Sequence, residues 1–167
     1  MVEQKNGKRL VVIALGANMG DAQENVRRAA EVVAELPGVE LVRMSRLYQS
    51  EPAHVVDQDI FTNAVMTVLV EKRITTLDLL HSLQAIELSF GRVRHEHWGP
   101  RTLDLDIIDV AGELSDVEEL RIPHPYALVR DFVVTPLLEI APGHVLADGQ
   151  PVSRDKVEYG AVISAED

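Results

Sequence analysis

Hydrophobic positions along the chain alternate between short apolar runs and stripes at helical spacing. Leu10–Leu15 is a continuous apolar run of strand length, which is typical of a buried strand. A turn follows from Gly16 to Asp21, and Asp21 is a good residue to begin a helix. The apolar residues then recur at a spacing of three and four, at Val26, Ala29, Ala30 and Val33. Pro37-Gly38 ends this predicted helix.

The same pattern predicts a second helix between further strands. Val39–Tyr48 and Phe61–Val70 indicate the second and third strands, separated by a polar loop. Thr75 or Thr76 begins the second helix, and Gly91 suits its end. Its apolar stripe is Leu79, Leu83, Ile86 and Phe90. Leu103–Val110 indicates a fourth strand. The order βαββαβ predicts an α+β fold, a ferredoxin-like sandwich with extra C-terminal elements.

The C-terminal third has weaker signals. Ala111–Glu119 is an acidic linker or a hairpin, and Ile122–Pro125 is a stiff turn because both of its prolines fix φ. We expect a short helix over Tyr126–Arg130. Phe132–Ile140 is apolar and should return to the core. The tail after Pro142 has no strong periodicity.

Composition excludes several classes of protein. The 167 residues predict one domain, and 46% hydrophobic with 26% charged residues fit a soluble globular protein. A net charge of −11 argues against a broad nucleic-acid or anionic-membrane surface, although a few arginines suffice to bind a small polyanion such as ATP. There is no cysteine for thiolate–metal chemistry, and no apolar run approaches the ~20 residues of a membrane span. The polar N-terminus lacks a signal-peptide core, so we expect a cytoplasmic protein.

The candidate chemistry is concentrated in residues 91–106. Asp104 and Asp106 should share one face of the fourth strand, roughly 7 Å apart, with Leu105 on the other face. Magnesium prefers one or two carboxylates together with phosphate oxygens and water. Three arginines precede the pair, at Arg92, Arg94 and Arg101. Arginine suits bidentate contact with phosphate, so the segment predicts a magnesium–nucleotide site. Taken alone, an aspartate pair of this kind is more often the solvated face of a strand, and it is the neighbouring arginines and the single tryptophan that favour the functional interpretation.

Other polar positions have two interpretations each. Asn63 lies in an apolar strand on the same face as Phe61, where it could read the edge of a flat heterocycle or bond to a neighbouring loop. Gln84 and Glu87 share a helix face and either lie on the surface or reach the site. Gly16 and Gly20 lack the Lys-Ser/Thr ending of a Walker motif, which favours a tight turn over a phosphate loop.

Several motifs in one order resemble a known family. They are LGANMGD (15–21), Tyr48 with Glu51-Pro52, Asp57-Gln58 through FTNA (61–64), GRVR (91–94), WGPRTLDLD (98–106) and IPHP (122–125) with RDFV (130–133). Together they resemble 6-hydroxymethyl-7,8-dihydropterin pyrophosphokinase over roughly residues 10–142. WGPRTLDLD is the most specific of the motifs. The resemblance implies an enzyme that transfers diphosphate from MgATP to the pterin hydroxymethyl group and releases AMP, in folate biosynthesis.

The resemblance also implies a role for each site residue. Asp104 and Asp106 would hold two magnesium ions. The polyphosphate and nucleotide would be bound by Arg92, Arg94, Arg101, His124, Arg130, Gln84 and Glu87. The pterin would be bound by Ser50, Glu51, Phe61, Asn63 and Phe132, with Trp98 closing over both substrates. His97 stands where the family commonly has arginine, and Pro125 where some members have tyrosine, so these two residues affect the details of ATP binding.

Two rival classes share part of this pattern. A metal-dependent phosphodiesterase would also use an aspartate pair and arginines, but would release nucleotide without an acceptor. A non-catalytic nucleotide-sensing module would bind ATP without consuming it. The pyrophosphokinase interpretation is favoured, with ATP and a reduced pterin as small-molecule partners and a monomer as the expected state.

Overall fold

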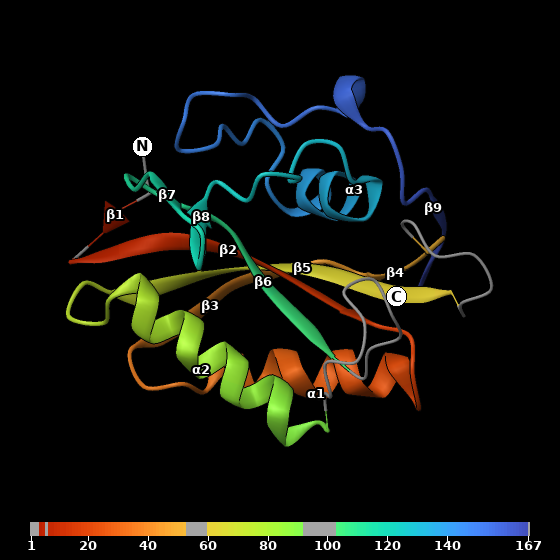
Figure 1. The fold of residues 1–167 in the computed structure, drawn as a ribbon, viewed down its shortest axis with the longest axis horizontal. Coiled ribbons are helices and arrows are strands. Elements are labelled where there is room, and N and C mark those ends of the chain that lie inside the picture. The colour runs from red at the N-terminus through yellow and green to blue at the C-terminus, as the bar shows by residue number, and fades with distance from the viewer. Residues whose placement is uncertain (1–3, 6, 53–59, 92–102, 167) are drawn as a thin grey trace.

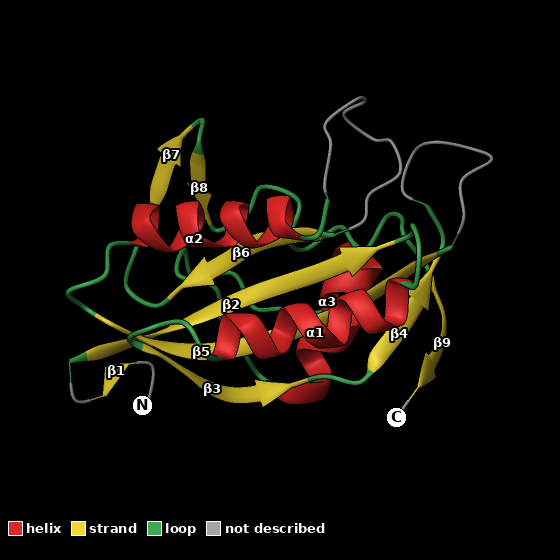
Figure 2. Ribbon diagram, turned by 90° about the horizontal axis from the view of Figure 1, so that it is seen from below, coloured by secondary structure: helices red, strands yellow, loops and turns green. Residues whose placement is uncertain are grey.

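The computed structural model describes residues 4–5, 7–52, 60–91 and 103–166. Within them, a seven-stranded sheet has two helices on one face and one on the other (Figures 1 and 2). The elements are β1 (Gln4–Lys5), β2 (Lys8–Ala17), α1 (Ala22–Ala34), β3 (Val39–Met44), β4 (Leu47–Ser50), β5 (Phe61–Glu71), α2 (Thr76–Ser89), β6 (Asp104–Val110), β7 (Ser115–Val117), β8 (Leu120–Ile122), α3 (Asp131–Ile140), the 3-10 helix η1 (Arg154–Lys156) and β9 (Val162–Glu166).

Neighbouring strands of this sheet are antiparallel. The path runs β1-β2-β5-β4-β9; off this path, β6 pairs with β2 along the same edge as β1, and β3 pairs with β5. β2 and β5 are central because their long apolar runs are buried on both faces. The predicted βαββαβ elements are therefore all present, in a mixed fold of helices on an antiparallel sheet.

The two faces of the sheet carry separate cores. α1 and α2 pack their predicted stripes against one face, where Val26, Leu79 and Leu83 meet Leu105 and Ile107 of β6. α3 covers the other face, with a core that includes Val12, Val65, Ile108, Val133 and Leu137. This division matters for function, because side chains that alternate along β5 and β6 face either the two-helix core or the α3 side.

The helix starts follow the sequence prediction. The Asp21 side chain accepts a hydrogen bond from the Glu24 amide at 3.2 Å, and Thr75 accepts one from the Asp78 amide at 3.0 Å. Thr75 rather than Thr76 therefore caps α2. None of the helices in the described part of the chain is long and apolar enough to span a bilayer.

The predicted second strand, Val39–Tyr48, is two strands. Its interruption lies at Ser45, whose amide donates to the Val65 carbonyl at 2.9 Å while its hydroxyl accepts from the Val65 amide at 3.0 Å. Because the Ser45 side chain takes the place of a backbone partner, the regular ladder stops there. The chain resumes as β4, which carries Tyr48 and Ser50 beside β5.

The predicted helix over Tyr126–Arg130 is wrong. This segment is a series of turns, in which Ala127 bonds back to His124 at 3.1 Å and Val129 to Tyr126 at 3.3 Å. Five residues are too few to offset the cost of nucleating a helix, and Arg130 instead forms a backbone bridge with Tyr159. Of the two alternatives for 111–119, the hairpin is correct, since β7 pairs with β8.

Candidate functional site

The acidic pair lies on the α3 side of β6. Asp104 and Asp106 are half-buried, whereas Leu105 between them is buried in the two-helix core. Two residues of strand separate the carboxylates by roughly 7 Å. The predicted alternation of these three side chains is confirmed, and both carboxylates face the same side of the sheet.

A row of residues crosses three strands from Asp104. Asp104 pairs with Gly16 of β2, Gly16 with Asn63 of β5, and Asn63 with Tyr48 of β4. Directly paired residues share a face, and two strand spacings put Asp104 and Asn63 about 10 Å apart at Cα. The row therefore links the acidic pair to the asparagine that the sequence singles out.

Gly16 belongs to β2 and not to the turn that the sequence predicts. The strand continues to Ala17, so Gly16 has a strand neighbour on each side. A Cβ at this position would lie 3.0 Å from Asn63 Nδ2, which means that the Asn63 amide group extends over the glycine. The absence of a side chain keeps the surface between Asp104 and Asn63 open to the amide.

Asn63 is buried, and a residue of β4 is hydrogen-bonded to its side chain. Its Oδ1 accepts a 2.5 Å hydrogen bond from the hydroxyl of Ser50, which is fully buried. The predicted hydrogen bond between Asn63 and a neighbouring loop is thus correct in part, because the side chain is hydrogen-bonded but its partner lies in a strand. The amino group at Nδ2 then carries the donors suited to reading a heterocycle. Phe61, half-buried at the start of β5, pairs with Ser50 and shares the face of Asn63.

His124 lies near the acidic pair. Its amide donates to the Ile108 carbonyl at 2.8 Å, and its Nδ1 accepts from the Tyr126 amide at 3.1 Å, so the neutral ring carries its proton on Nε2. Burial, and next the positive charge of Arg130, lower the pKa of His124 to about 4, while the negative charge of Asp104 opposes this change. At neutral pH His124 is therefore an uncharged N–H donor.

Arg130 is surrounded by aromatic rings just before α3. Only 8% of the residue is exposed, and its guanidinium carbon lies 5.0 Å from the ring centre of Tyr126 and 5.6 Å from that of Phe132. Its Nε donates to the Tyr159 hydroxyl at 2.9 Å. Such contacts fix the orientation of a cation on the same side of the sheet as Asp104.

Glu87 contacts β6 from the opposite face. It is 3% exposed, and its Oε2 accepts the amide hydrogen of Leu105 at 2.7 Å. The Leu105 amide lies between the two aspartates, on the edge of β6 that faces away from β2. Glu87 therefore supports the strand that carries the acidic pair. Gln84, one turn earlier on α2, is half-buried, and nucleotide contact by either residue stays a prediction.

The remaining predicted residues divide into two groups. Phe132 is the second residue of α3 and is half-buried, and Glu51 follows β4, where its amide donates to the Ala161 carbonyl at 3.0 Å. Arg92, Arg94, His97, Trp98 and Arg101 lie outside the described residues. Their roles stay predictions based on the resemblance.

The acidic pair offers the type of ligand that magnesium takes from proteins. Within residues 4–5, 7–52, 60–91 and 103–166 there is no group of three or more histidine, aspartate or glutamate side chains that could hold a metal ion. Asp104 and Asp106 supply two hard oxygen ligands, which is the number that magnesium commonly takes from protein when phosphate and water complete its shell.

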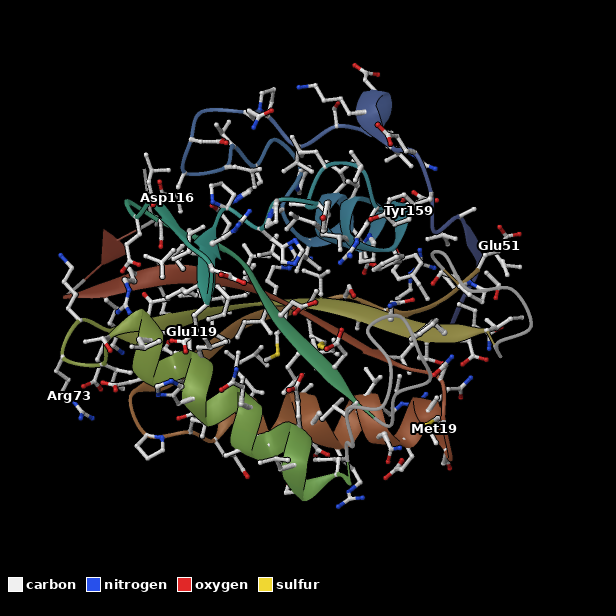
Figure 3. All side chains as sticks on the ribbon, viewed as in Figure 1. Met19, Glu51, Arg73, Asp116, Glu119 and Tyr159 are labelled. Atoms are coloured by element: carbon white, nitrogen blue, oxygen red, sulfur yellow. The ribbon has the colours of Figure 1, made fainter. Side chains whose placement is uncertain are left out.

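Two features of this face were missed by sequence reasoning. Asp109 Oδ2 lies 2.9 Å from His144 Nε2, and Asp109 Oδ1 accepts from the Ala147 amide at 3.0 Å. A bulge in β6 at Ile108 turns Asp109 to this side. The other is Tyr159, which Figure 3 shows on the α3 side of the sheet. His144 and Tyr159 both lie in the tail after Pro142, whose sequence has no periodicity that would predict these contacts.

Comparisons with known proteins agree on one family. The family model described as 7,8-dihydro-6-hydroxymethylpterin-pyrophosphokinase matches residues 12–142. A 2-amino-4-hydroxy-6-hydroxymethyldihydropteridine pyrophosphokinase from Pseudomonas aeruginosa is 43% identical over 140 residues, covering 84% of this chain and 85% of its own. The protein of the same name from Haemophilus influenzae is 40% identical over 141 residues, covering 84% and 87%.

The solved structures give the same fold. A crystal structure of Plasmodium falciparum HPPK-DHPS with pteroate superposes with a TM-score of 0.64 at 13% identity, over 95% of this chain. This chain spans 42% of the Plasmodium chain, and at such identity the likeness shows the fold alone. The family match and the two bacterial relatives carry the assignment, and this chain belongs to the 7,8-dihydro-6-hydroxymethylpterin-pyrophosphokinase family.

Proposed function

We propose that this protein transfers diphosphate from MgATP to the hydroxymethyl group of 6-hydroxymethyl-7,8-dihydropterin and releases AMP, as a step of folate biosynthesis. Family membership supports the reaction. The single observation that carries the proposal for these residues is the row from Asp104 through Gly16 to Asn63. The row brings Asp104, which we assign to the metal, and Asn63, which we assign to the heterocycle, onto one face of the sheet about 10 Å apart at Cα, and this spacing supports the proposal.

The acceptor end of the row suits a flat, polar ring. We assign Asn63 to the edge of the pterin, with its amide oriented by Ser50. Phe61 and Phe132 are assigned to the two faces of the ring, and Ser50 and Glu51 to its surroundings. A ring bound there would direct its hydroxymethyl arm along the row towards Asp104. Leaving the buried amide without its ligand contacts costs free energy, so the site should discriminate strongly in favour of a matching heterocycle.

The donor end suits a polyphosphate. We assign Asp104 and Asp106 to two magnesium ions, which when bound would neutralise phosphate charge. Arg130 adds a cation with fixed orientation, and neutral His124 adds an N–H donor. Arg92, Arg94 and Arg101 are assigned to the same polyphosphate, with Gln84, Glu87, His97 and Trp98 near the nucleotide, by resemblance.

The reaction needs positioning and charge neutralisation more than covalent catalysis. The hydroxymethyl oxygen forms a bond to the β-phosphorus of ATP, and the bond between that phosphorus and the oxygen bridging to the α-phosphorus breaks. AMP leaves with the bridging oxygen, and the proton of the attacking hydroxyl is released to water. Residues of this chain hold the two substrates in line and distribute the negative charge over cations and N–H donors.

Several finer features are part of the same proposal. The order β6-β2-β5-β3 supports a ferredoxin-like sandwich for the central βαββαβ segment, with β4, β9 and α3 added to it. A single domain over the whole chain, a monomeric state and a cytoplasmic location stay predictions. Light scattering coupled to size-exclusion chromatography would test the monomer.

The direct test is AMP formation by the purified protein with MgATP, with and without the reduced hydroxymethylpterin. We expect AMP only when the pterin is present. A phosphodiesterase would release AMP without it, and a sensing module would release none in either case. An Asp104→Asn variant that retains the wild-type thermal stability serves as the control for contaminating activity.

A further inference from the structure

The C-terminal tail beyond the family match contacts two of the assigned site residues. The tail backbone bonds to the segment before α3, since the Asp131 amide donates to the Tyr159 carbonyl at 3.0 Å and the Glu158 amide donates to the Val129 carbonyl at 2.8 Å. On its other side, Ala161 accepts the Glu51 amide hydrogen. Residues 158–161 thus join the start of α3 to the end of β4.

Further contacts fix the position of this segment. Asp131, which is 5% exposed, accepts a hydrogen bond from the Val162 amide at 2.9 Å and pairs with Arg154 at 3.5 Å. β9 then pairs with β4, where Val162 is opposite Ser50. The tail therefore has a fixed position relative to the start of α3, which is next to Arg130, and relative to β4, which carries Ser50.

Tyr159 holds Arg130 in two ways. Its hydroxyl accepts the Nε hydrogen of Arg130 at 2.9 Å, and its ring centre lies 5.9 Å from the guanidinium carbon. The hydroxyl holds the Nε edge, and the guanidinium that it orients is the group that we assign to the polyphosphate. A guanidinium has five N–H donors in a rigid plane, so fixing one edge orients the other.

Gly160 sets the position of Phe132. The glycine has a φ of +74°, and a Cβ built on it would lie 2.5 Å from Phe132 Cε2. Real side chains essentially never approach so closely, so the aromatic ring lies directly against the glycine backbone. Any larger residue would displace Phe132, which is the ring assigned to one face of the pterin.

We infer that Tyr159 and Gly160 are positioning residues for the reaction: Tyr159 orients Arg130 for ATP, and Gly160 seats Phe132 for the pterin. The inference rests on the proposed function, which supplies the substrates of Arg130 and Phe132. It makes the tail a part of the site that residues 12–142 do not contain. Replacing Tyr159 should then affect ATP more than the pterin, and replacing Gly160 should affect the pterin more than ATP.

The test measures the KM of each substrate in Tyr159→Phe and Gly160→Ala. Tyr159→Phe keeps the ring and loses the hydroxyl, and should raise the KM for ATP about tenfold with little change in the KM for pterin. Gly160→Ala should raise the KM for pterin about tenfold and the KM for ATP by a clearly smaller factor, because Phe132 also contacts Arg130. Gly149→Ala is the matched control, because Gly149 also has a positive φ (+92°) but no atom lies within 4 Å of a Cβ placed there.

A coupling measurement separates positioning from general support of the fold. ATP affinity is measured by calorimetry for Tyr159→Phe, Arg130→Met and the double variant. The Tyr159→Phe effect should disappear once Arg130 is replaced. An effect of the same size in both backgrounds, an unchanged KM for ATP, or equal rises in both KM values would overturn the role of Tyr159.

The measurement on Gly160→Ala does not depend on Tyr159→Phe, so it remains available if Tyr159→Phe does not fold. In that case Gly160→Ala tests the inference alone, and a KM for pterin equal to that of Gly149→Ala would overturn it. Failure of the proposed function would have a different signature. The wild-type protein would then form no AMP with ATP and pterin, or would form it at the same rate without pterin.

Discussion

Replacing Glu87 should weaken the fold and the acidic pair together. Its Oε2 accepts the Leu105 amide hydrogen at 2.7 Å, between Asp104 and Asp106, and the residue is 3% exposed. Glu87→Met keeps a similar length and removes the acceptor. Glu87→Gln keeps an oxygen at the same position. The first variant leaves a buried amide without a partner, whereas the second can still accept its hydrogen.

The expected cost follows from that single amide. An unsatisfied buried N–H costs about 1–3 kcal/mol, so Glu87→Met should lower the free energy of unfolding by that amount. For a protein of this size the melting temperature should fall by about 2–4 °C for each kcal/mol. Glu87→Gln should lose less than Glu87→Met. The β6 backbone beside the aspartates should also shift, which raises the magnesium concentration needed for half-maximal activity.

Urea unfolding followed by circular dichroism measures the first effect, and a magnesium titration of AMP formation measures the second. Glu31→Gln, at an exposed position on α1, is the control for removing a helical carboxyl group. The reasoning is refuted if Glu87→Met unfolds at the wild-type urea concentration. It is also refuted if stability falls while the magnesium dependence stays unchanged, since the support of the acidic pair would then be absent.

Three further predictions concern the row and its neighbour. Asp104→Asn or Asp106→Asn should lower kcat at least about 100-fold with the fold intact by circular dichroism, because metal charge stabilisation is worth several kcal/mol; near-normal kcat in both would contradict the metal assignment. Asn63→Ala should weaken pterin binding by about 1–3 kcal/mol in calorimetry and leave ATP binding unchanged; equal losses for both ligands would mean a structural role. The lowered pKa of His124 favours its neutral form in the folded state, so its contribution to stability is present above about pH 6.5 and is lost as the pH falls towards 4, by at most about 3 kcal/mol. Urea unfolding between pH 4 and 7 should therefore show a smaller loss for His124→Asn than for the wild type, and parallel curves would contradict the assignment.

Periodicity predicts the helices and strands of this fold well where one face of the element packs on a single core along its whole length. The stripe from Val26 to Val33 and the run from Leu10 to Leu15 lie as expected, because a helix or strand that packs on one core repeats its apolar residues regularly. The prediction of one strand over Val39–Tyr48 is wrong because Ser45 uses its side chain in place of a ladder bond. A single serine in a strand-like segment gives no signal of that exchange.

Only those features of the site that involve residues close together in the sequence can be predicted from it. The shared face of Asp104 and Asp106 follows from the two-residue period of a strand. The contact of Gly16 with Asn63 depends on the register between β2 and β5, and the contact of Glu87 with Leu105 depends on how α2 crosses β6. These are tertiary relations, which a single sequence does not encode in its spacing.

The most direct test of the central claim is to follow the phosphorus atoms of ATP by ³¹P NMR during turnover with the reduced hydroxymethylpterin. The account predicts that AMP and a pterin diphosphate ester appear in equal amounts, with the β- and γ-phosphorus of ATP both in the ester. ADP with a pterin monophosphate would mean transfer of one phosphoryl group. AMP with free diphosphate and unchanged pterin would mean hydrolysis, and either result would contradict diphosphate transfer by this site.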